Sequence, residues 1–114
     1  MPRPILRPID SNDANLLREI YIDSIQTQAP LAYTPEQVRA WVNLALLPGV
    51  LDRNFEEGKG WISGNDDGFA IRHPKNRLSL IYCRGRSSRQ GHGSALLETI
   101  ERDAHSMGIS RLHT

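Results

Sequence analysis

The residues best suited to chemistry lie in the segment SSRQGHGSALL, positions 87–97, where Gly91 and Gly93 flank His92 just before an apolar helix. A helix N-terminus presents unpaired N–H groups and about half a positive charge, so it attracts anions. Glycines remove side chains that would keep a phosphate away, and they permit backbone angles closed to other residues. Three arginines add positive charge nearby: Arg84, Arg86 and Arg89. The segment therefore predicts a phosphate or pyrophosphate site, although the glycine spacing alone is equally typical of a tight turn.

Other reactive side chains have simpler structural interpretations. Cys83 lies in an apolar run and is interpreted as a small buried residue rather than a nucleophile. The histidines outside the glycine segment are scattered, so no metal site is predicted. Four carboxylates are interpreted as solvated, with one of them able to act as a base through water: Glu56, Glu57, Asp66 and Asp67. Four aromatic residues are expected in or near the core: Tyr21, Tyr33, Trp41 and Trp61.

The whole chain has 114 residues and a net charge of +1, which fits one domain without a field for nucleic acid or an anionic membrane. Its single cysteine excludes an internal disulfide. The opening residues, MPRPILRPID, lack the apolar core of a signal peptide, and no run approaches the roughly 18 apolar residues of a membrane span. We therefore expect a single cytoplasmic domain over 1–114 with neither a nucleic-acid nor a membrane partner.

Hydrophobic periodicity predicts the elements that position the glycine segment. Asp10 or Ser11 is expected to cap the first helix, and Thr34 with Gln37 the second. Segment 50–60 fits either a helical turn or a loop. The predicted elements are strand 5–9, helix 10–28, helix 34–47, strands 60–63, 68–72 and 77–84, helix 93–108 and strand 109–114. This order, β-α-α-β-β-β-α-β, predicts an α+β (mixed α/β) fold in which strand 77–84 is apolar enough to be central.

The run LIYCRGRSSRQGHGSALLETIERDAHSMGISRLHT, positions 80–114, resembles the central motif of the GNAT superfamily of acyl-CoA-dependent N-acyltransferases. That motif consists of a strand, a short loop, Q/R-x-x-G-x-G/A, a helix and the next strand. The segment YTPEQVRAW, positions 33–41, also resembles the second helix of many such enzymes, and the hairpin residues agree as well, so that the resemblance covers almost the whole chain. It implies a central, mostly antiparallel mixed sheet flanked by helices.

The resemblance also implies a cosubstrate, acetyl-CoA, and a reaction without a metal. Amides of the glycine segment would hold the pyrophosphate of coenzyme A, and the pantetheine arm would follow the preceding strand. The residues carried over as cofactor-binding are Ile81, Tyr82, Cys83, Arg84, Ser88, Arg89, Gln90, Gly91, His92, Gly93 and Ser94. The backbone amide of Cys83 would polarise the thioester carbonyl. His92 would use only its backbone, with its side chain toward solvent.

For the acceptor, the resemblance implies a primary amine of a small molecule or protein that attacks the thioester directly, with Tyr33 on the acceptor side. It assigns neither the general base nor the general acid. Ser88 stands where the family has Gln or Arg, and Gly85 stands where it usually has proline. The family also continues beyond the fifth strand with a helix and a strand pair, so the domain is expected to be C-terminally incomplete.

This incompleteness leads to two further expectations. The chain is expected to be a homodimer, or to have its sheet completed by a partner chain, rather than a stable monomer. The alternative to an active N-acetyltransferase is a catalytically weak or inactive GNAT-like module that binds coenzyme A, or a truncated product completed by a partner chain.

Overall fold

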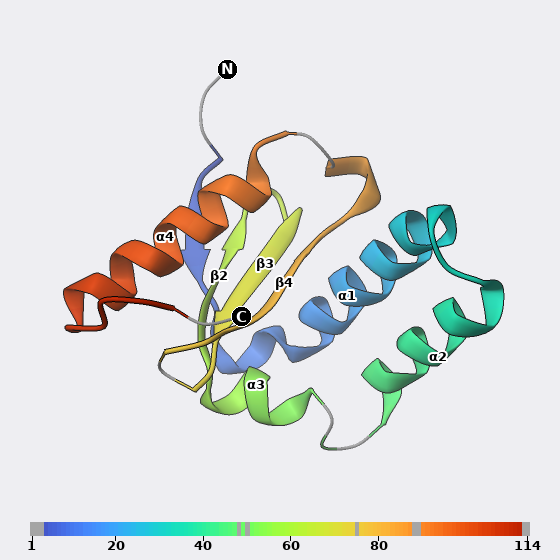
Figure 1. Cartoon of the computed structure of the whole chain (residues 1–114), viewed down its shortest axis with the longest axis horizontal. Helices are drawn as coiled ribbons and strands as arrows, with labels where there is room; N and C mark the ends of the chain where they lie inside the picture. The colour runs from blue at the N-terminus through green and yellow to red at the C-terminus, as the bar shows by residue number, and fades with distance from the viewer. Residues whose placement is uncertain (1–3, 48, 50, 75, 88–89, 113–114) are drawn as a thin grey trace.

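The computed structural model describes residues 4–47, 49, 51–74, 76–87 and 90–112. Its centre is a four-stranded antiparallel sheet in the order β1-β2-β3-β4. The strands are β1 (Leu6–Pro8), β2 (Lys59–Ser63), β3 (Gly68–Arg72) and β4 (Leu78–Cys83). β3 is buried along its whole length, because it has a strand on either side and helices on both faces (Figure 1).

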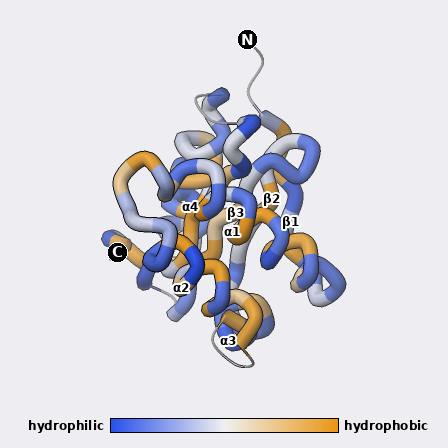
Figure 2. The backbone as a smooth tube through the Cα atoms, turned by 90° about the vertical axis from the view of Figure 1, so that its right-hand side faces the viewer, coloured by the Kyte–Doolittle hydropathy of each residue, from blue (hydrophilic) through white to orange (hydrophobic). Residues whose placement is uncertain are grey.

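Four helices surround this sheet: α1 (Ala14–Gln28), α2 (Pro35–Leu46), α3 (Asp52–Glu57) and α4 (His92–Ser106). α1 covers one face of the sheet and α4 crosses the other, whereas α2 packs mainly against α1 (Figure 1). Hydrophobic and hydrophilic residues alternate along the helical tubes in Figure 2, as amphipathic elements require. The expected α+β fold is confirmed.

The two sheet faces carry separate hydrophobic cores. The core beneath α1 contains Leu17, Ile20, Tyr21, Phe55, Ile62, Phe69 and Ile71, among others. The core beneath α4 is smaller, with Ala70, Leu96 and Ile100 fully buried. Consecutive strand residues face opposite sides, so Phe69 and Ala70 enter different cores. Burial of each large apolar side chain contributes roughly 1.5–3 kcal/mol.

Local capping sets the helix starts as the sequence predicts. Asp10 accepts from the N–H of Asn12 (2.7 Å), at the start of a 3₁₀ turn that leads into α1. Thr34 and Gln37 form the expected capping box at α2, with bonds of 2.9 and 3.2 Å. The ambiguous segment 50–60 divides into α3, whose Phe55 enters the core, and the first residues of β2.

The hairpin turn between β2 and β3 takes the backbone angles that its residue types allow. Gly64 has φ 66° and Asp66 has φ 58°, both in the left-handed region. The N–H of Asp67 closes the turn on the carbonyl of Ser63 (2.9 Å). This turn lies beside the glycine segment and becomes part of the site described below.

Two expectations about the sheet are wrong. β4 lies at the edge of the described sheet rather than at its centre. Residues 109–112, the described part of the predicted last strand, form no strand. The N–H of Ile109 bonds to the carbonyl of Ala104 (3.0 Å) in the turn that closes α4. The first residue of the segment is therefore held by the end of the helix and does not pair with β4. Leu112 still reaches the core beneath α4.

Candidate functional site

The glycine segment joins the end of β4 to the start of α4 (Figure 1). After a 3₁₀ turn, Gly85–Ser87, α4 begins at His92, one residue earlier than predicted. Gly91 is the N-cap, with φ 83° and no side-chain bond to the helix. The first helical bond runs from the N–H of Ala95 to the carbonyl of Gly91 (3.0 Å). The N–H groups of residues 92–94 therefore precede the helical ladder, where an anion can accept from them.

Within the described part of the chain, neither the backbone conformation of Gly93 nor a close neighbour requires glycine at this position. Its φ is not in the left-handed region, and nothing lies within 4 Å of the position that a Cβ atom would occupy. The expectation of a special backbone angle therefore holds for Gly91 and fails for Gly93. Inside a helix, glycine costs about 1 kcal/mol relative to alanine. A destabilising glycine that faces open space is what a closely approaching ligand would require.

The free edge of β4 presents the backbone groups of alternate residues. The N–H of Arg84 donates across to a carbonyl just before β3 (2.7 Å), and this bond fixes the alternation along the antiparallel pair. Tyr82 therefore directs its N–H toward β3, whereas Ile81 and Cys83 direct theirs away from it. In agreement, the carbonyl of Cys83 accepts from Nε2 of Gln28 (2.8 Å) rather than from β3.

The side chain of His92 does not point to solvent, contrary to the prediction. It is 8% exposed, and its Nδ1 lies 2.7 Å from Oγ of Ser63, the last residue of β2. Its Nε2 lies 3.7 Å from Oδ2 of Asp67. Helical side chains tilt toward the N-terminus of their helix, which directs the first side chain of α4 onto the β2–β3 turn. That turn supplies two polar partners for the imidazole.

Asp67 is likewise not the solvated loop carboxylate that was predicted. Its carboxylate accepts from the hydroxyl of Ser87 and from the N–H of Asn65 (2.9 Å), and it lies 3.5 Å from Nε of Arg86. Burial by itself would raise the pKa of this carboxyl, but the two hydrogen bonds and the nearby positive charges hold the pKa below its ordinary value. Asp67 is therefore a carboxylate at neutral pH.

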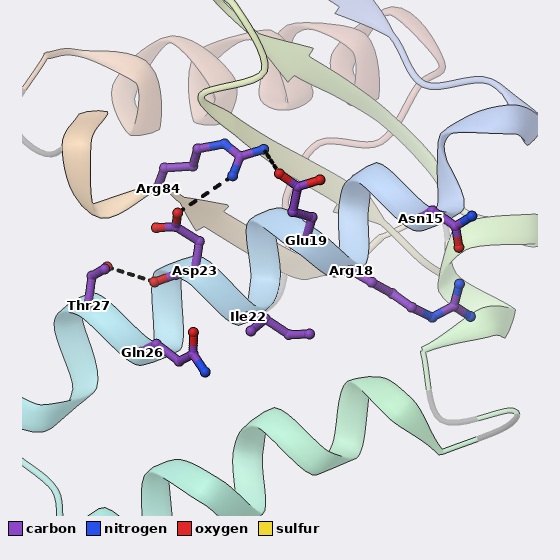
Figure 3. A pocket seen from close by; sticks show the side chains of 8 residues that line it. All are labelled: Asn15, Arg18, Glu19, Ile22, Asp23, Gln26, Thr27 and Arg84. Atoms are coloured by element: carbon purple, nitrogen blue, oxygen red, sulfur yellow. Dashed lines mark hydrogen bonds and ion pairs between the residues drawn. The ribbon is translucent and has the colours of Figure 1, made fainter.

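The guanidinium of Arg84 turns away from the glycine segment and toward α1 (Figure 3). It lies 3.1 Å from the carboxylate of Glu19 and 3.5 Å from that of Asp23, and its Nε donates to the carbonyl of Asp66 (2.7 Å). Its charge is thus compensated, whereas the side chain of Arg86 is 63% exposed. Beside this group lies a pocket of about 470 Å³, lined by Asn15, Arg18, Glu19, Ile22, Asp23, Gln26, Thr27 and Arg84.

Cys83 and Tyr82 are held in their protonated forms. Burial raises the pKa of the Cys83 thiol, and the negative charge of Asp67 raises it further. Burial also raises the pKa of Tyr82, whose ring packs edge-on against Tyr21 with centroids 4.8 Å apart. The interpretation of Cys83 as a non-nucleophilic residue agrees with this environment.

Of the remaining predicted site residues, some lie at the start of α4 and one lies apart from it. Gln90 and Ser94 are exposed on either side of the N-cap of α4. Tyr33 lies apart, before α2, where its half-exposed ring packs edge-on against Trp41 (4.6 Å). Ser88 and Arg89 lie outside the described residues.

Sequence reasoning did not find two members of the site, Ser63 and Ser87. Both are buried, and both become functional candidates only through partners distant in sequence. In the sequence near Ser63, the turn residues Gly64 and Asp66 predict the β2–β3 turn. They do not predict which residues pack against that turn.

Comparisons with known proteins find likeness in structure rather than in sequence. The amino-acid sequence matches no protein-family model and no curated protein. Among solved structures, it is similar to a GCN5-related N-acetyltransferase (aminotransferase, class II) from Rhodopseudomonas palustris, at 23% identity and a TM-score of 0.86. This likeness covers 95% of the present chain and 69% of the other.

Two further solved structures agree. The PaiA N-acetyltransferase from Thermoplasma acidophilum, in complex with coenzyme A, is 18% identical with a TM-score of 0.70, over 95% of this chain and 76% of that one. A ribosomal-protein-alanine N-acetyltransferase from Brucella melitensis is 16% identical with a TM-score of 0.59, over 98% and 79%. The chain therefore has the GNAT fold, as the glycine motif predicted. Among the described residues, no helix has both the length and the apolar character that crossing a membrane requires.

Proposed function

We propose that this chain, which has the GNAT fold, is an acetyl-CoA-dependent N-acetyltransferase acting on a primary amine of a small molecule or protein. The observation that carries the proposal is Gly93, a glycine at an open helix start with no structural reason of its own. The similar solved structures are N-acetyltransferases, and one of them holds coenzyme A.

In this proposal, two sets of backbone groups hold the cosubstrate. The N–H groups of residues 92–94 at the start of α4 donate to the pyrophosphate, and Gly93 lets it approach. The outward N–H groups of Ile81 and Cys83 and the outward C=O of Ile81 pair with the pantetheine arm, while the C=O of Cys83 accepts from Gln28. The two sets are joined by the short segment between β4 and α4, so one extended ligand can contact both.

Acetyl-CoA supplies the activated acetyl group as a thioester. The protein's contribution is to orient it: the N–H of Cys83, on the free edge of β4, is proposed to donate to the thioester carbonyl as negative charge develops there. The acceptor amine attacks the carbonyl carbon directly, and loses a proton as the thiolate departs. Tyr33 is proposed on the acceptor side, where its ring is half-exposed and fixed against Trp41.

A thermal-shift measurement tests the binding half of the proposal. Acetyl-CoA at about 100 times its Kd is expected to stabilise the fold by about 2.7 kcal/mol. For a domain of this size, that corresponds to a rise in Tm on the order of 10 °C or more. No shift at millimolar acetyl-CoA would overturn the pyrophosphate site. Release of free thiol in the presence of a panel of primary amines tests the transfer itself.

A second candidate is a GNAT-fold module that binds coenzyme A without transferring its acetyl group. The observation in its favour is the ion pairing beside β4: the carboxylates of Glu19 and Asp23 both engage the guanidinium of Arg84 rather than standing free to accept a proton from an amine. Binding of acetyl-CoA without thiol release from any amine in the panel would select this candidate.

Association with a second chain is also a proposal. Within the described residues, β4 pairs with β3 alone, so the part of its other edge that is not assigned to the pantetheine arm, at Leu78 and Ser79, is open to a second copy or to a different polypeptide. Sedimentation analysis at micromolar concentration tests this, and a compact monomer would contradict it.

A further inference from the structure

Four polar side chains, three of them buried, form a cluster beneath the glycine segment, and the proposed reaction does not use their chemistry. They come from the β2–β3 hairpin and from the glycine segment itself: Ser63, Asp67, Ser87 and His92. Ser63 is 0% exposed and Ser87 is 1% exposed, and His92 is buried as described above. Burying so many polar atoms is costly unless each is hydrogen-bonded, so the arrangement requires an explanation.

The cluster resembles a Ser-His-Asp arrangement, but its burial excludes nucleophilic catalysis. The Ser63 hydroxyl bonds Nδ1 of His92 at 2.7 Å, and the Asp67 carboxylate lies 3.7 Å from Nε2. A nucleophile must reach a substrate carbonyl, and Ser63 has no exposed surface. The cluster therefore acts on its neighbours within the protein.

Its geometry ties the connection between β4 and α4 to one turn at both of its ends. At the β4 end, the Ser87 hydroxyl donates to Oδ1 of Asp67, and the N–H of Arg84 donates to the carbonyl of the same residue (2.7 Å). At the α4 end, His92 contacts Asp67 and Ser63 through its two ring nitrogens. The N–H groups proposed to face the pyrophosphate begin at His92 itself.

Gly64 shows that the turn is shaped around this imidazole. It has φ 66°, and a Cβ atom there would lie 2.6 Å from Cε1 of His92 and 2.5 Å from Oδ2 of Asp67. Unlike Gly93, this glycine is required by contacts inside the protein. The ring of His92 therefore fits beside the turn only because residue 64 has no side chain.

We propose that His92 is a positioning residue: its imidazole, anchored on Ser63 and Asp67, fixes the first turn of α4 so that residues 92–94 are pre-organised for pyrophosphate. This inference rests on the proposed function, because it assigns a role toward coenzyme A. It also replaces the sequence-based expectation that only the backbone of His92 matters. A segment that is already ordered loses less conformational freedom on binding, which strengthens affinity without a new contact.

The charges around the imidazole allow two explanations to be distinguished: positioning of residues 92–94 by the cluster, and a direct effect of the cluster's charges on the bound ligand. The Asp67 carboxylate faces it from the β2–β3 turn and Arg86 from the 3₁₀ turn, 3.5 Å from that carboxylate. A carboxylate near a phosphate site repels the ligand, so removing it should strengthen binding if charge alone matters. If positioning dominates, Asp67→Ala weakens binding instead.

Calorimetric titration of the whole chain with coenzyme A tests the proposal. His92→Ala is expected to raise the Kd about tenfold, as lost pre-organisation predicts. His92→Asn, whose amide can replace Nδ1 toward Ser63, is expected to restore most of the affinity. Asp67→Ala is expected to weaken binding as well. The affinity for pantetheine, which lacks the pyrophosphate, is expected to stay at the wild-type value in every variant, whereas general damage to the fold would reduce it.

The controls separate failure of this inference from failure of the proposed function. If the wild-type chain does not bind coenzyme A, the proposed function fails and this inference falls with it. If the wild type binds and His92→Ala binds equally well, only the positioning role is overturned. If His92→Ala melts before titration, the milder Ser63→Ala decides: an unchanged Kd overturns the role, and a several-fold weaker one supports it.

Discussion

The two ends of α4 both carry a glycine with φ 83°, but only the C-terminal end is closed by its own chain. There, the N–H of Gly108 bonds to the carbonyl of His105 and that of Ile109 to Ala104, both at 3.0 Å. This Schellman pattern satisfies carbonyls that would otherwise lack partners. At the N-terminal end, Gly91 offers no side-chain cap, and within the described residues the first N–H groups remain available.

The side chains that anchor the two ends also differ. At the C-terminal end, Asp103 forms ion pairs with Lys59 (2.8 Å) and with Arg72, whose side chain is 2% exposed. At the N-terminal end, Asp67 and His92 engage serine hydroxyls and a backbone N–H as well as charges. The C-terminal anchor therefore joins α4 to the sheet through ion pairs, whereas the N-terminal anchor supports the helix start that is proposed to bind the pyrophosphate.

The largest expected effect is at the open end. Gly93→Val is expected to abolish the stabilisation by acetyl-CoA, a loss of at least about 100-fold in affinity or about 2.7 kcal/mol, because a branched side chain blocks the phosphate. Without ligand, the variant should be at least as stable as the wild type, since valine is a better helix former than glycine. Thermal shift and calorimetric titration measure both quantities.

Gly108→Ala provides the matched control at the closed end. It should cost about 1–2 kcal/mol because of the left-handed backbone, while leaving the Kd for acetyl-CoA unchanged. Wild-type affinity in Gly93→Val would show that the open end is not the binding site.

The next largest effect is expected at the C-terminal anchor. Asp103→Ala should lower the free energy of unfolding by about 2 kcal/mol, because it removes the carboxylate that faces a buried guanidinium. Urea denaturation measures this change, and Asp103→Asn, which keeps an acceptor, should lose less. The Kd for coenzyme A should not change. A tenfold weaker Kd in Asp103→Ala would show that the two ends of α4 are not independent.

The smallest effect is expected from pH. Burial opposes ionisation of Asp103, but hydrogen bonds from Lys59 and Arg72 hold its pKa below the ordinary value, and the pKa of Asp67 is lowered as well. A lowered carboxyl pKa contributes stability that is present above the unfolded value of about 3.9 and is lost as pH falls through the folded value.

The free energy of unfolding, measured in urea between pH 7 and pH 2, should therefore stay level and then fall in the acid range. Asp67→Asn and Asp103→Asn should each flatten part of this fall. An unchanged acid slope in both variants would contradict the assignment of these carboxylates.

Local features were predictable because neighbouring residues in the sequence determine them. The caps at Asp10 and Thr34, the β2–β3 turn and the glycine at the end of α4 each depend on a few consecutive residues and on their backbone preferences. The glycine segment before α4 was predictable for the same reason, and its resemblance to the GNAT motif gave the fold.

The environment of each side chain depended on residues far along the chain. Ser63 and His92 are separated by 29 positions, and Arg84 meets Glu19 across 65. The histidine assigned to solvent was therefore found buried, and the loop carboxylate at Asp67 became the centre of a hydrogen-bonded cluster. Periodicity also could not place β4 at an edge. An apolar strand that is covered by helices has the same hydrophobic pattern whether it lies at the edge or in the centre of the sheet. The sequence by itself determined the elements and the open start of α4, and the tertiary structure decided which side chains support that start, because only packing brings the β2–β3 turn beneath it.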